Sequence, residues 1–590
     1  MTSDLARAPF RLAAALLVAA AVALYSGSYG NPFVFDDLAV FARDGSSPLR
    51  WLPEASFSLV LAAFGADALP QRIVNALAHG ATGVALFGFL ARLFGVVLAD
   101  ARSRWLAFFG ALWFVVHPVA VYGVAYLMQR SIILATLFSV VALWCVLEGL
   151  ERRQARWYAA AGAAYLLALV SKEHAVMLPA VALALAVLVR GASPALLRRS
   201  LPALGIALAV AAAVLAPRLT LVGTAYEPNA AGLIARLGAD AALAYPLSVE
   251  NQATLFWRYL ATWLVPWPGW ISIDVRTSFP RELVAWPESA GFLLWLAYPA
   301  VAVALLIKGG RAGLAGFGLL CPWLLALTEV AAVRVQEPFV LYRSYLWMIF
   351  LPAILPAVVA PLAPRWRLVV PGVLCALLAA LALGRLETFA SPLALWDDAV
   401  GKNHDLAAPY VERPYVARGL AHLDERSFEA AAADFERALR LNPSSPEAYV
   451  GRGLLGLRSG RPRDALDDMD RALALDPEHA PGYYNRCAVN AALGQFAPAL
   501  RDCDRALALV PLNTEAWVNR GVVYASLGRP AHAAENFERA LELHPGHGPA
   551  HFNYGTLLMR AGQRAAAHGH FAAACEAGID QACVAGVIRR

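Results

Sequence analysis

Two adjacent carboxylates, Asp36 and Asp37, follow directly on the first long apolar run of the chain, Phe10 to Tyr29. If that run spans a membrane, the pair lies where the span meets water, and ionisable groups near the hydrocarbon are costly enough to indicate a function. Carboxylates placed there can deprotonate an acceptor hydroxyl or stabilise a developing oxocarbenium charge. The alternatives are a solvated pair in a loop, or the N-cap of a helix that begins near Leu38.

Four further polar clusters fall at the ends of later apolar runs, on the same predicted side as this pair. They are His117 with Pro118, Gln129 with Arg130, Lys172 with Glu173 and His174, and the segment 337–345, which contains Glu337, Arg343 and Tyr345. Arg and Lys suit a phosphate or pyrophosphate leaving group, and Arg does so by its bidentate geometry. A further pair, Asn75 and His79, lies four residues apart on one face of the second apolar run.

Each cluster also has a purely structural explanation. Lys172 and Glu173 can neutralise each other in a turn, and Arg343 can be a snorkelling flank of a span. Asn75 and His79 can be hydrogen-bond partners between helices. Acids, cations and a histidine that gather at one membrane face nevertheless favour a site that joins an anionic lipid-linked substrate to an acceptor.

The composition indicates a polytopic membrane protein. Of the 590 residues, 59% are hydrophobic and only 16% are charged, which is more apolar surface than a soluble protein of this length needs. Nearly all long apolar runs lie in 1–390, so we place the main domain boundary near Ser391–Asn403. We expect about eleven spans, at 10–29, 70–94, 104–117, 129–148, 157–171, 174–189, 201–222, 289–307, 313–330, 345–362 and 367–384.

The loops between these runs alternate in charge. The positive-inside rule makes one side cytoplasmic, and its basic residues are Arg7, Arg11, Arg102, Arg104, the stretch 151–156, Arg190, Arg198, Arg199, Lys308, Arg311, Arg365 and Arg367. The first apolar run is long and no small-residue cleavage site follows it, so we expect a retained span and a cytoplasmic N-terminus. An odd number of spans then places everything after residue 385, like the polar clusters, outside the cytoplasm.

The segment 255–270 is apolar but is interrupted by Arg258, Pro266 and Pro268. If it crossed the membrane, every later basic loop would move to the outside. We therefore expect an interfacial or re-entrant helix that places its tryptophans at the level of the lipid headgroups. These tryptophans are Trp257, Trp263, Trp267 and Trp270.

The clearest periodic signal lies in the last third of the chain. Residues recur there every 34 positions, including the sets Pro443, Pro477, Pro511, Pro545 and Ala438, Ala472, Ala506, Ala540. This is the tetratricopeptide period, in which each unit is a helix pair that buries its apolar face by stacking on its neighbours. The fold is therefore expected to be all-α, a multi-span core at 1–390 followed by an α-solenoid that presents a surface for a peptide or protein. We expect a lead-in helix at 391–411 and a repeat domain at 412–590, with full repeats at 412–445, 446–479, 480–513 and 514–547 and a degenerate fifth.

Four of the seven cysteines lie in the repeat region. Cys487 and Cys503 occupy facing positions of one helix pair and could form a bond. The spacing of Cys575 and Cys583 resembles that of secreted helical-repeat proteins, in which the two form a bridge. Disulfides persist only in oxidising compartments, so bonds here would support a periplasmic repeat domain. The alternative is four small buried residues.

Several functional classes are excluded or disfavoured. The sequence has no Gly-rich phosphate loop followed by Lys and Ser or Thr, and no Gly-x-Gly-x-x-Gly that opens a helix after a strand, which disfavours an ATP-driven transporter. A nucleotide-sugar enzyme acting from the cytoplasm is disfavoured because the candidate residues lie on the other side. No His/Cys set has zinc spacing, so no metal ligand is predicted. The net charge of +6 is spread out, which argues against a nucleic-acid partner.

In order and spacing, the motifs resemble the transmembrane and tetratricopeptide-repeat proteins of the O-mannosyltransferase type and their bacterial relatives. Those proteins join a multi-span C-superfamily glycosyltransferase core to a luminal or periplasmic repeat domain. The matching pieces are Phe33–Asp37, Asn75 with His79, His117-Pro118 with Gln129-Arg130, Ser171–Glu173, Arg258-Tyr259 with Ser272–Asp274, Arg343 with Tyr345, and Leu395–Asp398. The sequence departs from the family pattern in two places: Gln129 replaces a small residue before Arg130, and Glu337 precedes Arg343 at a distance.

The resemblance implies inverting transfer of a sugar from a polyprenyl-(pyro)phosphate to a hydroxyl, in protein O-glycosylation at the periplasmic face of a bacterial inner membrane. It implies Asp36 and Asp37 as catalytic residues, and Arg343, with Arg130 and Lys172, as ligands of the donor phosphate. No cofactor is assigned besides the lipid-linked sugar donor. The alternatives are a non-catalytic membrane-anchored scaffold for envelope or pilus assembly, and an envelope-glycan ligase or polymerase.

Overall fold

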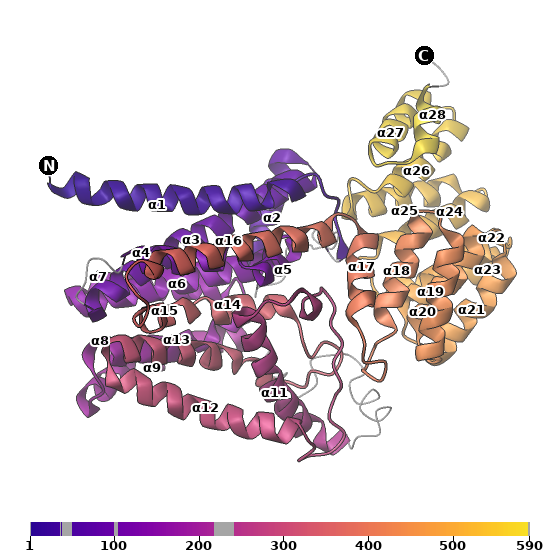
Figure 1. Ribbon diagram of the computed structural model, residues 1–590. Helices are drawn as coiled ribbons and strands as arrows, with labels where there is room; N and C mark the ends of the chain where they lie inside the picture. The colour runs from indigo at the N-terminus through magenta and orange to yellow at the C-terminus, as the bar shows by residue number, and fades with distance from the viewer. Residues whose placement is uncertain are drawn as a thin grey trace. The chain divides into compact units, whose positions relative to one another are not determined.

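The computed structural model describes residues 2–35, 37, 50–65, 67–98, 104–216 and 241–587. Throughout these residues the chain forms helices and connecting turns, with no β-strand, so the predicted all-α class is confirmed (Figure 1). The chain divides into two units, of which the first ends at Pro409 and the second begins at Tyr410.

The first unit carries the apolar helices. Eight of the described helical segments are long and apolar enough to cross a membrane, or ten if each of two bent pairs counts as one span. The eight segments contain α1 (Thr2–Tyr25), α3 (Ala68–Leu98), α6 (Arg130–Arg152), α8 (Leu178–Arg190), α9 (Pro194–Leu215), α12 (Glu288–Lys308), α13 (Gly310–Ala326) and α16 (Trp366–Leu386). The one remaining expected span, the fifth in chain order at 157–171, corresponds to α7 (Ala155–Leu169), which has 15 residues, fewer than the usual span of about 20.

Two of the expected spans are broken rather than straight. In the first, α4 (Arg104–Val115) is followed at 46° by the helical segment Pro118–Val124, which contains α5 (Val121–Val124). In the second, Leu341–Met348, with α14 (Ser344–Met348), is followed at 44° by Leu351–Val359, with α15 (Leu355–Val359). A proline lies at the start of each second half, where its missing N–H and its ring end the preceding helix. The breaks expose backbone groups that polar side chains can bind.

Helix α3 is central to the core of the first unit and packs against α1, α4 and α6. Its side chains Phe89, Leu90 and Leu93 have no exposed surface. The close approach to α6 depends on a glycine, because a Cβ atom at Gly88 would lie 2.1 Å from the ring of Trp144. Tight packing of this kind fixes which residues at the ends of α3 and α6 face each other.

The first part of the segment 255–270 belongs to α11 (Ala244–Leu264), a 21-residue helix that is not among the eight segments long and apolar enough to cross a membrane. The headgroup placement is wrong for Trp263, which is fully buried and donates a hydrogen bond to Ser344 Oγ at 2.8 Å. Trp257 is half-buried and donates a hydrogen bond to the carbonyl of Gly291. Trp267 and Trp270, beyond the helix end, are exposed. The prolines stop the helix after Leu264, so only these two tryptophans lie outside it.

The second unit is a row of antiparallel helix pairs. In chain order these are α18 (Arg413–Asp424) with α19 (Phe428–Leu441), α20 (Pro446–Arg458) with α21 (Pro462–Leu475), α22 (Ala480–Ala492) with α23 (Phe496–Leu509), α24 (Thr514–Ser526) with α25 (Pro530–Leu543), and α26 (Gly548–Arg560) with α27 (Arg564–Glu576), followed by α28 (Asp580–Val587). The last third of the chain therefore folds with the periodicity read from its sequence.

A repeated small-to-large contact joins the two helices of a pair. A Cβ atom at Gly419 would lie 2.7 Å from the Phe435 ring, and one at Gly521 would lie 2.6 Å from the Phe537 ring. In the third pair, Cys487 and Cys503 occupy the equivalent positions and are joined by a disulfide. A second disulfide joins Cys575 to Cys583 and ties α27 to α28.

The two bonds predict a simple labelling pattern. Alkylation in denaturant without reductant should label only the free thiols Cys145, Cys321 and Cys375, and prior reduction should expose all seven cysteines. Intact-protein mass spectrometry counts the labels. Seven labels without reductant would contradict both disulfides.

Candidate active site

Asp37 is the one member of the acidic pair that can be placed, since Asp36 lies outside the described residues. The Asp37 carboxylate is fully buried and accepts hydrogen bonds from the backbone N–H groups of Val34 (3.2 Å) and Met128 (3.4 Å). Burial raises the pKa of Asp37 to about 7, although these N–H groups and the charge of Arg72 act in the opposite direction. A carboxyl group with such a pKa can exchange a proton near neutral pH.

Arg72, which sequence reasoning did not single out, holds the same loop. Its guanidinium is buried and donates hydrogen bonds to the carbonyls of Asn31, Pro32 and Ala125. In the sequence, Arg72 is a single arginine near the start of a long apolar helix. Arginines commonly flank membrane spans, so its position did not indicate a special role. Arg72 and Asp37 together fasten the loop after α1 to the segment that follows α5.

That segment, Tyr126–Arg130, is the point at which the predicted clusters meet. The Tyr126 ring contacts the rings of Phe35, with centroids 5.4 Å apart, and Tyr342, with centroids 6.0 Å apart. Gln129 Oε1 accepts a hydrogen bond from Lys172 Nζ at 2.9 Å. The loop of Asp37, the turn of Lys172 and the segment of Arg343 are thus brought together from three distant parts of the chain.

Lys172 is buried and has no carboxylate partner within ion-pair distance among the described residues. Its ammonium group lies over the Tyr342 ring, 5.0 Å from the centroid, in a cation–π contact. Burial lowers the pKa of Lys172 to about 7, with Arg50 as the second cause. Lys172 and Glu173 do not form an ion pair with each other. Glu173 pairs instead with Arg50 at 2.9 Å, so the alternative of a self-neutralised turn is wrong.

Arg343 belongs to a buried ionic cluster around a residue that the sequence analysis missed. Glu329 Oε2 lies 3.3 Å from Arg343 Nη1 and 2.9 Å from Arg334 Nε, and Glu329 Oε1 lies 2.8 Å from His174 Nε2. Arg343 also donates to the carbonyl of Glu337 at 2.9 Å. Glu329 stands at the end of the apolar run 313–330, so nothing in its neighbourhood in the sequence marked it.

Arg130 is engaged by the protein on every guanidinium nitrogen. It donates to Asn75 Oδ1 at 2.7 Å, to the backbone and side-chain oxygens of Gln71, and to Ser56 Oγ, and its Cζ stacks 3.9 Å from the Phe57 ring centroid. Asn75 in turn donates to the carbonyl of Val124 at 3.1 Å. These contacts join α2 (Trp51–Phe64), α3, the segment after α5 and α6. Arg130 and Asn75 therefore fasten helices together in this structure.

The histidine candidates also bind protein groups. His79 lies 2.6 Å from the hydroxyl of Tyr345 and 2.9 Å from the carbonyl of Val115, deep among the spans. His117 accepts from the Val119 N–H, donates to the carbonyl of Trp263 at 3.0 Å and stacks on the Trp263 ring. The contacts of His79 correspond to the alternative of hydrogen bonds between helices.

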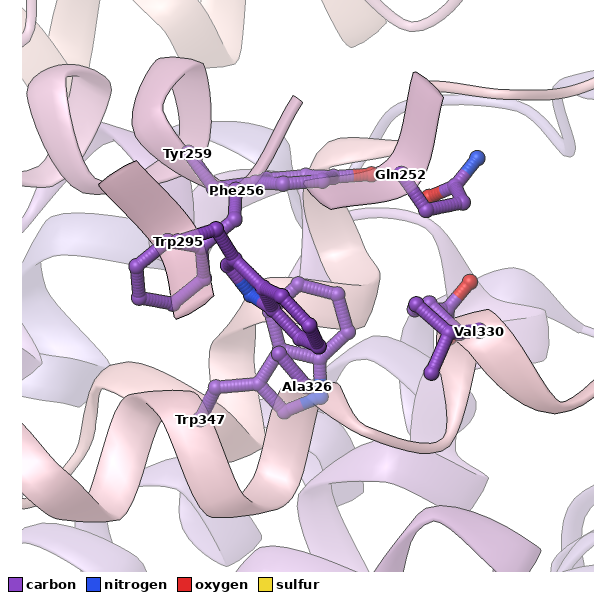
Figure 2. A pocket seen from close by; sticks show the side chains of 8 residues that line it. Gln252, Phe256, Tyr259, Trp295, Ala326, Val330 and Trp347 are labelled. Carbon is purple, nitrogen blue, oxygen red and sulfur yellow. The ribbon is translucent and has the colours of Figure 1, made fainter. Parts of the chain in front are cut away.

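Arg258 on α11 packs its guanidinium over the Phe339 ring, 4.7 Å from the centroid, and burial lowers its pKa. The same helix lines a cavity of about 10 Å³, which is close to the space of one water molecule. Figure 2 shows its aromatic lining, and Glu329 contributes the carboxylate. The lining is Gln252, Phe256, Tyr259, Trp295, Ala326, Glu329, Val330 and Trp347. The cavity is too small for a sugar or a lipid in this arrangement.

The geometry thus gathers the Asp37 carboxyl group, Lys172 and the ionic cluster of Glu329 at one end of the helix bundle. Helices α3, α6 and α8 all begin at this end, and their other ends carry a separate set of ion pairs, Arg92–Glu148, Arg152–Glu148 and Arg190–Glu151. Among the described residues, no group of three or more His, Cys, Asp or Glu side chains is arranged to hold a metal ion. The cluster is suited to binding an anion beside a carboxyl group that titrates near neutral pH.

Comparison with known families gives matches in both units. Residues 51–220 match the family described as dolichyl-phosphate-mannose-protein mannosyltransferase, and residues 416–480 and 514–547 match tetratricopeptide repeats. These matches confirm the resemblance found in the sequence and support a multi-pass membrane glycosyltransferase of this type with a repeat region for protein interaction. The mannosyltransferase match includes Asn75, His117, Arg130 and Lys172 but neither the acidic pair nor Arg343. No curated protein matches the chain.

Solved structures match over the repeats. They include pilF of Pseudomonas aeruginosa (23% identity, TM-score 0.25, 28% of this chain and 76% of that chain) and a tetratricopeptide-repeat protein of Thermus thermophilus (26%, 0.28, 30% and 96%). Another is YrrB, described as having an unusual peptide-binding site (26%, 0.22, 32% and 96%).

Proposed function

We propose that this protein transfers a sugar or glycan from a polyprenyl-(pyro)phosphate donor to a hydroxyl acceptor at the periplasmic face of a bacterial inner membrane. The observation that carries the proposal is the meeting of Asp37, Lys172 and the Arg343 segment around Tyr126–Arg130. Charged groups inside a membrane protein are expensive and mark functional sites, and a mere anchor would not need them to converge. The mannosyltransferase match supports the same class of reaction.

The acidic pair would supply the base. We assign proton removal from the acceptor hydroxyl to the Asp36–Asp37 pair, within which Asp37 also anchors the loop through Val34 and Met128. The acceptor oxygen bonds to the anomeric carbon of the sugar from the side opposite the phosphate, and the bond between that carbon and the phosphate oxygen breaks. The proton of the acceptor hydroxyl passes to the carboxylate. The donor leaves as the polyprenyl phosphate or pyrophosphate anion.

The cations would stabilise that leaving anion. Lys172 is the best placed of the three predicted phosphate ligands, because its charge has no carboxylate partner in the described part of the chain. Arg343 contributes through a cluster in which two arginines face one Glu329 carboxylate. Arg130 already has protein partners on all its nitrogens, so we assign it to positioning.

Two observations support the periplasmic face. The basic residues expected to be cytoplasmic include Arg152 and Arg190, whose ion pairs lie at the ends of α6 and α8 opposite the site. The repeat unit carries two disulfides, which persist in oxidising compartments. We further propose that the acceptor is a protein held by the repeats, because helical-repeat surfaces serve mostly for protein binding.

The pKa values of two groups predict a bell-shaped pH profile. A general base must be deprotonated, so activity should rise as pH increases through about 7, the pKa of Asp37. A phosphate-binding ammonium must be protonated, so activity should fall as pH increases through about 7, the pKa of Lys172. Initial rates of sugar transfer across pH should therefore peak close to neutrality. Lys172→Arg should remove the alkaline limb alone, since guanidinium stays charged throughout; an unchanged alkaline limb would contradict the role of Lys172.

The experiment that tests the function compares periplasmic glycopeptides. A strain that lacks this protein should lose one set of O-linked peptides by mass spectrometry, and expression of the unaltered protein should restore that set. Asp36→Asn, expressed to the same level, should not restore it. Identical glycopeptides in the parent and the deletion strain would reject protein glycosylation, and an altered envelope glycan in the deletion strain would identify a ligase or polymerase instead.

A further inference from the structure

The segment that carries Arg343 is tied to the last helix of the first unit through a loop with no role in the chemistry proposed above. That helix, α17 (Pro392–Lys402), immediately precedes the end of the unit in sequence. The loop is 271–276, which includes the Ser272–Asp274 motif. The residues that make the ties are buried and polar, and each tie is a hydrogen bond to backbone.

The first tie joins the end of α17 to the loop. Asn403, 4% exposed, accepts from the backbone N–H of Arg276 at 2.6 Å and donates to the carbonyl of Asp274 at 2.8 Å. One asparagine thus binds both a donor and an acceptor of the loop backbone. Lys402 and Arg385 add bonds to the carbonyl of Ile271, at 2.8 and 3.3 Å, and both pair with Asp398.

The second tie joins the loop to the Arg343 segment. Arg276, 5% exposed, donates from Nη1 to the carbonyl of Gln336 at 2.5 Å and pairs with Asp274 through Nη2 at 2.5 Å. The next residue, Glu337, accepts from Arg343 through its carbonyl. Arg276 therefore links the end of α17 to the segment directly: its backbone binds Asn403 and its side chain binds Gln336.

We propose that Arg276 and Asn403 are positioning residues, which hold the 336–343 segment in the register that aims Arg343 at the donor phosphate. The inference rests on the proposed function for its consequence, but its structural part stands alone. Neither side chain touches the cluster around Tyr126–Arg130. The guanidinium of Arg276 is committed to Gln336 and Asp274, so it acts through the backbone of the segment rather than on a substrate.

The structural arm of the test is hydrogen exchange of the full-length protein in detergent. Two N–H groups of the segment report on its order: Val340 N–H, which donates to the Tyr259 hydroxyl, and Arg343 N–H, which donates to the carbonyl of Val340. Arg276→Ala should speed exchange in 336–343 by about tenfold, and Asn403→Ala should do so to a smaller extent, because local order depends on few bonds. Arg367→Ala is the control, since Arg367 likewise donates to backbone carbonyls, those of Leu362 and Ala360, in the same unit.

The functional arm measures transfer from polyprenyl-phosphate mannose as the probe donor. Arg276→Ala should raise the donor KM by about tenfold with a smaller change in kcat, because the lost order weakens donor binding. Arg276→Lys should recover part of the effect, and Arg367→Ala should show none. Unchanged exchange and unchanged donor KM in both Arg276→Ala and Asn403→Ala would overturn the proposal.

The two arms separate this inference from the function on which it rests. If the unaltered protein transfers no sugar from the probe donor, the proposed function is rejected for that donor. Hydrogen exchange alone then decides whether Arg276 positions the segment. If Arg276→Ala unfolds the unit, exchange rises in α3 as well as in 336–343, and the milder Asn403→Ala then decides the matter.

Discussion

Asn in place of Asp36 or Asp37 should lower sugar transfer by about 10²- to 10⁴-fold, the range that a positioned general base contributes. Asp37→Asn should also have an effect on structure. Asp37 receives two backbone N–H groups on its two oxygens, and an asparagine side chain offers only one oxygen. Asp37→Asn should therefore also loosen the loop after α1 and lower the thermal midpoint of the protein.

The measurement is the rate of transfer from polyprenyl-phosphate mannose by detergent-solubilised protein, with the thermal midpoint recorded for each variant. Asp67→Asn serves as the control, because Asp67 is exposed in the same unit and caps only the Leu69 N–H. If both variants of the pair keep wild-type rates while protein levels match, the pair is not catalytic. A loss confined to Asp36→Asn would leave Asp37 with the anchoring role alone.

The second large effect concerns stability. Glu329→Gln should destabilise the first unit by about 3–5 kcal/mol, because removing one partner of a buried ion cluster leaves uncompensated charge. The Glu329 side chain is 3% exposed, and its single negative charge faces Arg334 and Arg343 at 2.9 and 3.3 Å. Glutamine keeps the shape and the hydrogen-bonding capacity toward His174 but supplies no charge.

The thermal midpoint of Glu329→Gln in detergent should therefore lie well below that of the wild-type protein. The matched control is Glu387→Gln, since Glu387 is exposed in the same unit. Activity should fall together with stability, because Arg343 loses the nearer of its two carboxylate partners, Glu329 at 3.3 Å, and keeps only Glu337 at 3.7 Å. A Glu329→Gln variant with the wild-type midpoint would mean that the cluster is hydrated and that Arg343 does not depend on Glu329.

A hydrogen-bonded pair elsewhere in the first unit gives a useful contrast. His79 and Tyr345 meet at 2.6 Å deep among the spans, where neither group needs a charged partner. His79→Asn could still reach the carbonyl of Val115, so its effect on stability should be smaller than that of Glu329→Gln. Buried charge, more than buried polarity, makes the Arg343 region sensitive to substitution.

The sequence by itself determined the features that repeat or that depend on near neighbours. The 34-residue period predicted the helix pairs of the second unit, because each pair packs by the same small-to-large contacts. The position of Cys487 opposite Cys503 followed from the same register, in which Gly419 faces Phe435 elsewhere. Most apolar runs became helices of the expected extent, since apolar length and the absence of charge are local properties.

The tertiary structure alone decided which polar residues meet. Glu329 and Arg72 were missed because each is one ionisable residue at the end of an apolar run, and only packing reveals that Glu329 faces two arginines. Trp263 was misplaced because its burial depends on α11 packing against His117 and Ser344 from distant segments. Helix breaks at Pro118 and Pro352 set the direction of the following segments, and that direction brings Tyr126 between Phe35 and Tyr342. Periodicity reports the geometry of one helix or one repeat, whereas a site assembled from four segments depends on angles between helices that no local pattern encodes.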